Sequence, residues 1–483
     1  MKRDLLAELR NNNELANRDL FRLIATLSLP AILAEFTNTA MEYVDASMVG
    51  HLGAEAAASV GLVASSTWLF YGLCNALNIG FTVQVAQAIG AGDDQNARGL
   101  VRQGLLLSLG VSLFWAVLCI AISGSLPRFL GGAPEIQAGA TSYFRVVSAS
   151  MVICGPLYMS VGCLEASGDI KTSARINILM CFLNVIFNGL LIFPTQTYHP
   201  AGISITLPGA GLGILGAALG TMMSDIVGLV LILTALLVRS EKLHIRAAEK
   251  LSFNPRQIRT AFRLALPVAL QQAILSGAQV MLTRIVSPLG TVAVAANSFS
   301  VTAEGFCYMP SFGVGVAAST VIGQSIGARR KDLTKRLAWI VTALGIGIMT
   351  VSGILLYIFA PFMIGILTPD PAIKELGVTV LRIEAFAEPL FGASIVVNGV
   401  LRGAGDTKVP SFINFCSMWL IRLPLAALFA GTVPVIADFF GGTLPTDLGL
   451  RGVWIAMAIE LCIRGSLFLI RLARKRWDLV TAL

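Results

Sequence analysis

Leu164–Asn177 reads LEASGDIKTSARIN, and the chain repeats this stretch at Leu401–Asn414 as LRGAGDTKVPSFIN. The Gly-Asp, Lys and Ile-Asn positions of the two copies are all separated by one offset, 405 − 168 = 237. The same offset relates other matching segments: Leu29-Pro30 with Leu266-Pro267, Leu52-Gly53 with Leu289-Gly290, and Ile89-Gly90-Ala91 with Ile326-Gly327-Ala328. Because one register holds from about residue 29 to residue 177, the repeat takes precedence over other signals of fold. The chain consists of two copies of one unit.

Composition places both copies in a membrane. Apolar residues make up 55% of the chain and charged residues 13%, with a mean hydropathy of +0.78, whereas about 25% of a soluble domain is charged. Apolar runs repeatedly reach the roughly 20 residues that cross a bilayer. Twelve helices are expected, six per copy, at about 22–48, 58–89, 99–124, 138–164, 175–194, 212–238, 262–286, 295–326, 337–361, 376–401, 411–432 and 451–472. The predicted fold class is therefore all-α integral membrane, with twelve transmembrane helices in two six-helix lobes.

The distribution of Lys and Arg predicts the topology. Basic residues gather at both termini and in the even-numbered connections, so both termini are expected in the cytoplasm of a multi-pass inner-membrane protein. The predicted domains are a cytoplasmic segment 1–20, a first lobe 21–238, a basic connection 239–263 and a second lobe 264–476. The net charge of +8 reflects this bias better than nucleic-acid binding, since no basic patch carries base-stacking aromatic residues.

Several classes of chemistry lack their residues. The eight cysteines fall within expected spans at spacings that suit neither a metal cluster nor a disulfide framework, and the three histidines are scattered. The Gly-Asp turns of the repeat are interpreted as structural: glycine permits a positive φ and aspartate caps the next helix. GxxxxGK[ST] is missing. An integral-membrane enzyme is disfavoured, and no cofactor or metal is expected apart from sodium as a coupling ion.

The first expected helix carries an unusual polar stripe. Glu35, Asn38, Glu42 and Asp45 are spaced by three, four and three residues, which keeps them on one helical face. Ionisable residues inside a bilayer commonly cost a few kcal/mol each unless they face a bundle interior or water, so the stripe indicates function. The alternative is that Glu42 or Asp45 is simply solvated near the outer surface. Pro30 is expected to kink the same helix.

The most informative positions are those that break the repeat. Asn184 and Asn188 lie one turn apart on the fifth helix, and with Asp45 they form a polar set in the first copy. At the 237-residue offset their counterparts are apolar: Leu282 for Asp45, Ile421 for Asn184 and Leu425 for Asn188. Since the scaffold is duplicated and these side chains are not, we expect them to carry chemistry.

With these motifs, the chain resembles the multidrug and toxic compound extrusion (MATE) family. The resemblance extends from about Phe21 to Arg476 and rests on LSLPAILAEFTNTAMEYVDASMVGHLG in the first helix, QAIGAG after the second, both copies of the repeated stretch, and NVIFN in the fifth helix. It implies two lobes related by a pseudo-two-fold axis along the membrane normal. It also implies a central cavity that opens to either side in turn, with inward sodium or proton flow driving export of organic compounds.

The resemblance assigns roles to individual residues. The cation-binding residues it implies are Asp45, Tyr143, Asn184, Asn188 and, in the sixth helix, Thr221. One carboxylate among neutral oxygens suits a small cation or a proton, so the coupling ion stays open. A change of kink at Pro30 is the expected coupling element. The family's second acidic positions, in helices seven and ten, correspond to Leu275 and Phe391, which puts a second-lobe cation site in doubt unless Glu384 and Glu388 supply acidity by another geometry.

The leading hypothesis is a cation-coupled antiporter that works as a monomer. Four acidic residues are candidates for lining its cavity and meeting substrate, and they favour cationic amphiphiles over anions: Glu35, Glu42, Glu304 and Glu388. The alternative is a flippase for lipid-linked precursors or polysaccharides from the same superfamily, which would be favoured by more helices and a strongly basic cavity. A channel is less consistent with a duplicated lobe whose acidic residues are asymmetric.

Overall fold

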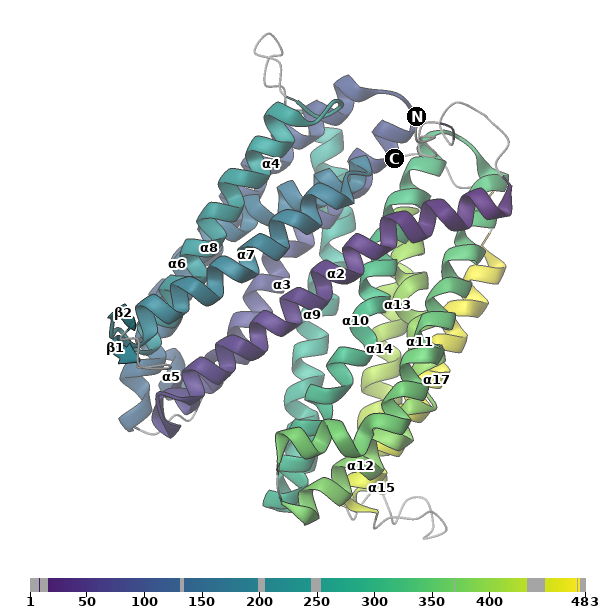
Figure 1. Cartoon of the computed structure of the whole chain (residues 1–483). Helices are drawn as coiled ribbons and strands as arrows, with labels where there is room; N and C mark the ends of the chain where they lie inside the picture. Colours follow the sequence, from purple (N-terminus) through teal and green to yellow (C-terminus); the bar gives the residue numbers. More distant parts are fainter. Residues whose placement is uncertain are drawn as a thin grey trace. The chain divides into compact units, whose positions relative to one another are not determined.

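The computed structural model describes residues 8, 16–130, 134–198, 205–244, 253–368, 370–431, 448–475 and 477, and these residues are almost entirely helical (Figure 1). The helices of the first copy are α2 (Asn17–Gly50), α3 (Ala54–Gly90), α4 (Asp94–Ile122), α5 (Leu126–Phe129), α6 (Pro134–Ser167), α7 (Ile170–Ile192), α8 (Ile214–Thr234) and η2 (Ala235–Arg239). Those of the second copy are α9 (Pro255–Val286), η3 (Ser287–Leu289), α10 (Thr291–Gly327), α11 (Lys331–Leu367), α12 (Pro371–Ala385), α13 (Glu388–Gly403), α14 (Lys408–Cys416), η4 (Ser417–Arg422), α15 (Leu423–Phe429) and α17 (Gly449–Arg474). The all-α membrane class is confirmed.

One expected span is broken. Eleven of the described helices are long and apolar enough to cross a membrane. The twelfth, expected at 376–401, is formed by α12 and α13, which are separated by a turn at Phe386 and Ala387. Pro389 lies in the first turn of α13, where its ring clashes with the carbonyl four residues earlier and it has no N–H to donate. The interruption therefore has a local cause in the sequence.

One helix boundary and one connection differ most from the sequence prediction. α9 begins at Pro255, inside the connection expected at 239–263, because proline is favoured in the first turn of a helix. A hairpin follows α7, in the connection between the helices expected at 175–194 and 212–238. Its strands, β1 (Pro194–Tyr198) and β2 (Ile205–Ala210), pair antiparallel with a bulge near Gln196. It is the only sheet among the described residues.

The duplication appears in the packing of the helices. In the first copy, α3 packs on α4 and α6, and α8 packs on α6 and α7. In the second copy, α10 packs on α11 and α13, and α17 packs on α13 and α15. These are the same neighbours at the 237-residue offset, so the two copies share one packing arrangement.

The two compact units of the structure do not coincide with the two sequence copies, because the first half of α2 and the first half of α9 each belong to the unit formed by the other copy. One unit comprises residues 36–269 and the other residues 1–35 and 270–482. The first half of α2 packs within the second unit, where a Cβ on Gly313 would lie 2.5 Å from the backbone nitrogen of Ile32. The first half of α9 packs within the first unit, where Gly80 leaves room for the backbone of Ala261. The units thus differ from the expected lobes, 21–238 and 264–476, by these half-helices. α2 and α9 each continue as one helix through their prolines.

The repeated Gly-Asp turns have the expected geometry. Gly168 and Gly405 have φ angles of 96° and 76°, in the region that side chains other than glycine rarely adopt. Asp169 accepts a hydrogen bond from the backbone N–H of Thr172 at 3.2 Å, and Asp406 accepts one from Val409 at 3.4 Å. Both aspartates cap the helix that follows, which confirms the structural interpretation of the motif.

Candidate functional site

A chain of hydrogen bonds joins three helices of the first copy. Asn188 of α7 donates through Nδ2 to Asp45 Oδ1 of α2 at 2.7 Å and to Asn184 Oδ1 at 3.0 Å. Asn184 in turn donates through Nδ2 to Thr221 Oγ1 of α8 at 3.1 Å. Thr221 donates to the carbonyl oxygen of Ala217, also on α8, at 3.2 Å. The structure thus brings together four of the five residues expected to bind a cation.

Space for the two amides comes from α8. Asn184 and Asn188 are both 0% exposed, and Thr221 and Asp45 are half-buried. A Cβ on Gly220 would overlap the Oδ1 atom of Asn188, so glycine is required there for the amide to take this position. That Oδ1 atom is itself buried and has no hydrogen-bond partner among the described residues. The site therefore contains an unsatisfied oxygen beside the Asp45 carboxyl group.

The fifth expected residue, Tyr143 of α6, lies near Asp45. The two side chains are close enough for the carboxylate charge to act on the phenol, and Tyr143 packs against an apolar cluster that includes Val63 and Phe144. The hydrogen-bond chain described above does not include its hydroxyl group. Tyr143 therefore borders the site from α6.

Sequence reasoning did not assign a role to a second carboxyl group nearby. Asp225 lies one turn beyond Thr221 on α8 and accepts a hydrogen bond from Cys154 of α6 at 3.4 Å. Its charge also interacts with that of Asp45. The spacing of four residues from Thr221 was the signal that could have identified it.

The site presents oxygen ligands of the kind that hard cations prefer. In the present arrangement the Nδ2 group of Asn188 bridges the oxygens of Asp45 and Asn184. Turning this amide over would direct its unsatisfied Oδ1 to the same place, giving three oxygens around one point. No group of three His, Cys, Asp or Glu residues suited to a transition metal occurs within the described ranges. The chemistry available is reversible binding of a small cation or a proton.

The remaining candidates on α2 lie apart from this chain. Pro30 and Glu35 belong to the other compact unit, and the side chain of Glu42 is exposed. Asn38 accepts a hydrogen bond from Cys181 Sγ at 3.6 Å. Of the four residues in the polar stripe, Asp45 is the one that joins the buried amides.

The corresponding place in the second copy is apolar. Leu282 is 7% exposed and belongs to a hydrophobic cluster against which Leu425 also packs. The third counterpart, Ile421, lies in the π-helical turn η4. The scaffold is repeated there, but its polar residues are not.

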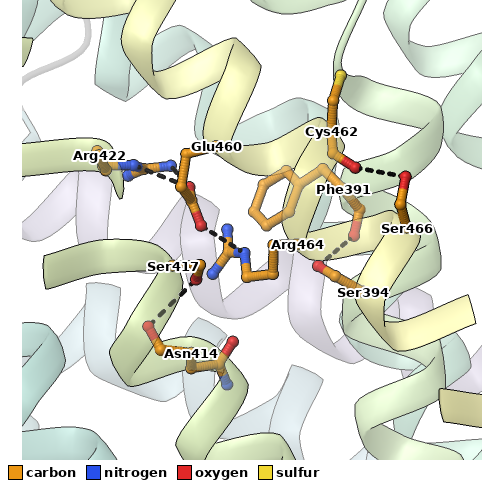
Figure 2. A network of polar contacts seen from close by, with 9 residues as sticks. All are labelled: Phe391, Ser394, Asn414, Ser417, Arg422, Glu460, Cys462, Arg464 and Ser466. Carbon is orange, nitrogen blue, oxygen red and sulfur yellow. Dashed lines mark hydrogen bonds and ion pairs between the residues drawn. The ribbon is translucent and has the colours of Figure 1, made fainter. Parts of the chain in front are cut away.

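A different set of charges is buried in the second copy (Figure 2). Arg422 of η4 pairs with Glu460 of α17, with Nη2 and Oε2 2.9 Å apart, and Arg464 Nε lies 3.1 Å from Glu460 Oε1. Glu460 is 0% exposed. The guanidinium of Arg464 lies over the ring of Phe391, 5.4 Å from its centroid. Phe391 thus stacks on a cation at the position where the family resemblance places an aspartate.

Three more glutamates surround this ion-pair network. Glu304 of α10 is 7% exposed and interacts with the charges of Arg422 and Arg464. Glu384 and Glu388, at the break between α12 and α13, are both 0% exposed. Glu304 and Glu388 were expected to line an open cavity, but in the structure they lie inside the packed second copy. Glu304 lies near the buried arginines, and Glu388 lies near Glu304 and Cys307 of α10.

Part of this cluster was within reach of the sequence. Glu304, Glu384 and Glu388 break the repeat as clearly as Asp45 does, because their counterparts are Thr67, Val147 and Met151. Arg422 also breaks the repeat, because its counterpart at the same offset is Val185, but it was not identified. Glu460 and Arg464 lie beyond the long loop before the last helix and were not identified either. Their signal is that they are charges within apolar spans.

Comparison with known proteins gives one consistent result. The MatE family profile matches residues 30–190 and 267–428, one match per copy. A "Probable multidrug resistance protein NorM" of Thermotoga maritima is 27% identical over 458 residues, covering 94% of this chain and 92% of that protein. A solved structure described as the outward-facing conformation of a multidrug resistance MATE family transporter superposes with a TM-score of 0.84 at 21% identity, covering 98% of this chain and 99% of that one. A transporter of the MOP superfamily from Pyrococcus furiosus, whose reversed pocket polarity is described as suggesting a different function, superposes with a TM-score of 0.85 at 21% identity, covering 98% and 100%.

Proposed function

Because the chain belongs to the MatE family, we propose that it is a cation-coupled antiporter that exports organic, cationic amphiphilic compounds across the cell's inner membrane by alternating access. The observation that carries the proposal is the contact between Asp45 and the buried amides of Asn184 and Asn188. All three residues break the repeat, since their counterparts in the second copy are apolar. The names of the relatives, which describe multidrug resistance proteins, support the choice of organic export.

The coupling ion binds at Asp45 in this proposal. A sodium ion would take the place that the Asn188 Nδ2 group occupies between Asp45 Oδ1 and Asn184 Oδ1, while the amide turns to present its oxygen. A proton would instead neutralise the Asp45 carboxylate and weaken its charge-assisted hydrogen bond to Asn188. Either event changes how α2 is held against α7. A change of the kink in α2 at Pro30 then couples ion binding to the opening of the cavity.

Acidic residues support a cationic substrate. Removing a positively charged compound from water requires compensating negative charge, which carboxylates within the helices supply. Substrate and coupling ion then compete for the same negative charge, so that one leaves as the other binds. This competition is what makes the exchange obligatory.

The first test is Asp45→Asn in proteoliposomes with an imposed ion gradient. Asparagine keeps the size of the side chain and removes its charge, so we expect loss of gradient-driven export of a fluorescent organic cation. Glu55→Gln is the control: its exposed side chain lies in the first turn of α3, outside the residues expected to bind the ion or the substrate, and it is expected to retain export. Full export by Asp45→Asn would contradict the proposal.

The coupling ion is identified in the same vesicles. A sodium gradient at fixed pH and a pH gradient without sodium are imposed separately. Export driven by one of them and not by the other assigns the ion. Export of lipid-linked oligosaccharide in place of organic cations would favour the flippase alternative.

A further inference from the structure

The turn between α10 and α11 differs in charge from its counterpart in the first copy. Residues 329–336 read RRKDLTKR, with five basic residues and one acidic residue, whereas residues 92–99 read GDDQNARG, with one basic residue and two acidic ones. The net charge of these eight matched positions is therefore +4 in the second copy and −1 in the first. We propose that this basic turn binds the headgroup of an anionic phospholipid, whose acyl chains lie along the exposed face of α11. This lipid site goes beyond the transport function proposed above and does not depend on it.

Arg329 has a backbone conformation that suits glycine. Its φ angle is 58°, and it is the only residue other than glycine with a positive φ in the part of the chain that the structure describes. The matched residue of the first copy is Gly92, with a φ of 76°. A side chain in this left-handed region is less favourable than glycine. The second copy thus carries an arginine at a position where the fold itself favours glycine, which indicates a role for the guanidinium outside the fold.

The charges at the start of α11 are also unfavourable for the helix. In the first copy Asp93 precedes α4 and caps it, accepting a hydrogen bond from the backbone N–H of Asn96 at 3.0 Å. At the matched position α11 has Arg330, whose side chain makes no capping hydrogen bond, and the helix then begins with Lys331. Positive charge at this end opposes the helix dipole, whereas negative charge there is favourable. An anion bound from outside would therefore offset the unfavourable charge.

Membrane topology alone does not account for this arrangement. The positive-inside rule depends on how many Lys and Arg residues lie near the ends of the spans, and it requires none of them at a left-handed position. Among the described residues, the exposed side chains of Arg329 and Lys335 have no hydrogen-bond or ion-pair partner. Arg336 differs, because its Nη2 donates to Asn17 Oδ1 at 2.6 Å. Two cationic side chains are thus available to a negatively charged group outside the protein.

The surface beyond the turn favours a lipid over a soluble anion. Trp339 lies four residues after Lys335 and three after Arg336, on the same side of α11, and it is 41% exposed. α11 has no charged residue after Arg336, and its large exposed side chains from there to its end are apolar or aromatic, among them Ile358 and Phe362. Basic residues, a tryptophan and a long apolar surface therefore follow one another along one helix. This order matches the phosphate, the interface and the acyl chains of a phospholipid.

The experiment measures lipid contact at Trp339 and does not depend on transport. The purified, full-length protein is reconstituted into vesicles of phosphatidylcholine that contain a rising fraction of phosphatidylglycerol brominated on its acyl chains. Bromine quenches tryptophan fluorescence at short range, and subtracting the signal of Trp339→Phe isolates this residue from the other five tryptophans. Brominated phosphatidylglycerol should quench Trp339 at a lower fraction than brominated phosphatidylcholine does.

Arg329→Gly separates lipid binding from folding. A basic residue near an anionic membrane surface contributes roughly fivefold in affinity, so the preference for phosphatidylglycerol should fall by about that factor. The melting temperature should stay the same or rise, because glycine suits a φ of 58°. Adding Lys335→Gln should bring the preference close to parity. Lys171→Gln, which removes an exposed lysine at the start of α7 in the first copy, is the matched control and should leave the preference unchanged.

Three results would overturn the proposal: equal quenching by the two lipids, a preference that survives both substitutions, or a preference that Lys171→Gln lowers as much as Arg329→Gly does. Inorganic phosphate in the buffer should not displace the lipid, and displacement would contradict the proposal by identifying a site for a soluble anion. If Arg329→Gly does not fold, Lys335→Gln alone must lower the preference. Absence of export with the lipid preference intact would refute the transport proposal and leave this one supported.

Discussion

At the scale of single residues, Gly220 determines whether the site at Asp45 can form. Its missing side chain leaves the volume that the Asn188 amide occupies, and that amide joins Asp45 to Asn184. Gly220→Ala would force the α7 amide to move, because a Cβ would overlap Asn188 Oδ1 and approach its backbone nitrogen to 3.1 Å. We expect a loss of about 1–3 kcal/mol of stability and a larger, separate loss of ion-driven export.

The matched control lies on the opposite helix. Gly189, next to Asn188 in sequence, has no atom within 4 Å of the place where a Cβ would be. Gly189→Ala should be neutral or stabilising by about 0.5–1 kcal/mol, because alanine favours helices over glycine. Melting temperatures in detergent and export in proteoliposomes check both variants. Equal export by Gly220→Ala and Gly189→Ala would show that the position of Asn188 is not needed.

At the scale of elements, the second Gly-Asp turn does more than cap a helix. Asp406 accepts a hydrogen bond from Arg471 at 2.8 Å and pairs with Lys475 at 3.4 Å, which ties the start of α14 to the end of α17. Burial alone would raise the pKa of Asp406, but the hydrogen bond from Arg471 and the charge of Lys475 outweigh it and lower this pKa below its usual value. Its repeat counterpart, Asp169, caps α7 through Thr172.

This difference predicts a pH-dependent stability. A carboxyl group whose pKa is lowered by folding stabilises the protein above its unfolded pKa, about 3.9, and loses that contribution as pH falls through the folded pKa. Since Arg471 is partly exposed, Asp406→Asn should cost about 1 kcal/mol at neutral pH and little once the pH has fallen through the lowered folded pKa of Asp406. Asp169→Asn is the control, because asparagine caps helices as well as aspartate does. Melting curves of both variants across pH test this; a constant deficit for Asp406→Asn would refute it.

Some elements could not be predicted from local sequence. The break between α12 and α13 was signalled by Pro389, but Pro30 and Pro267 lie in helices that run on, so proline alone does not decide the outcome. The hairpin after α7 has Thr, Gly and Pro residues that equally suit an irregular loop. In each case tertiary packing around the segment selects one conformation, and the local sequence does not specify that packing.

At the scale of the whole molecule, the internal repeat allowed the fold to be predicted from sequence, and the positions that do not repeat identified the site at Asp45. Asp45, Asn184 and Asn188 were identified because a polar residue in one copy meets an apolar one in the other. Glu460 and Arg464 of α17 were missed because the register is lost across the long loops before the final helix of each copy. Arg422 of η4 lies within the register, opposite Val185, and could have been identified. The assignment of the first halves of α2 and α9 to compact units was also not predicted. It depends on close backbone contacts at two glycines, Gly313 with α2 and Gly80 with α9.

The topology expected from the basic residues remains a prediction that labelling can test. Lys171 and Lys331 lie in the first turns of α7 and α11, at helix ends that the positive-inside rule places in the cytoplasm. Ser125 and Lys374 instead follow helices that run to the opposite side. All four side chains are exposed. A membrane-impermeant maleimide applied to intact cells should therefore label Ser125→Cys and Lys374→Cys, but label Lys171→Cys and Lys331→Cys only after permeabilisation. The unsubstituted chain is the control, because six of its eight cysteines are buried and the other two are half-buried. Labelling of Lys171→Cys in intact cells would reverse the assigned orientation, and with it the direction in which ions and substrates move.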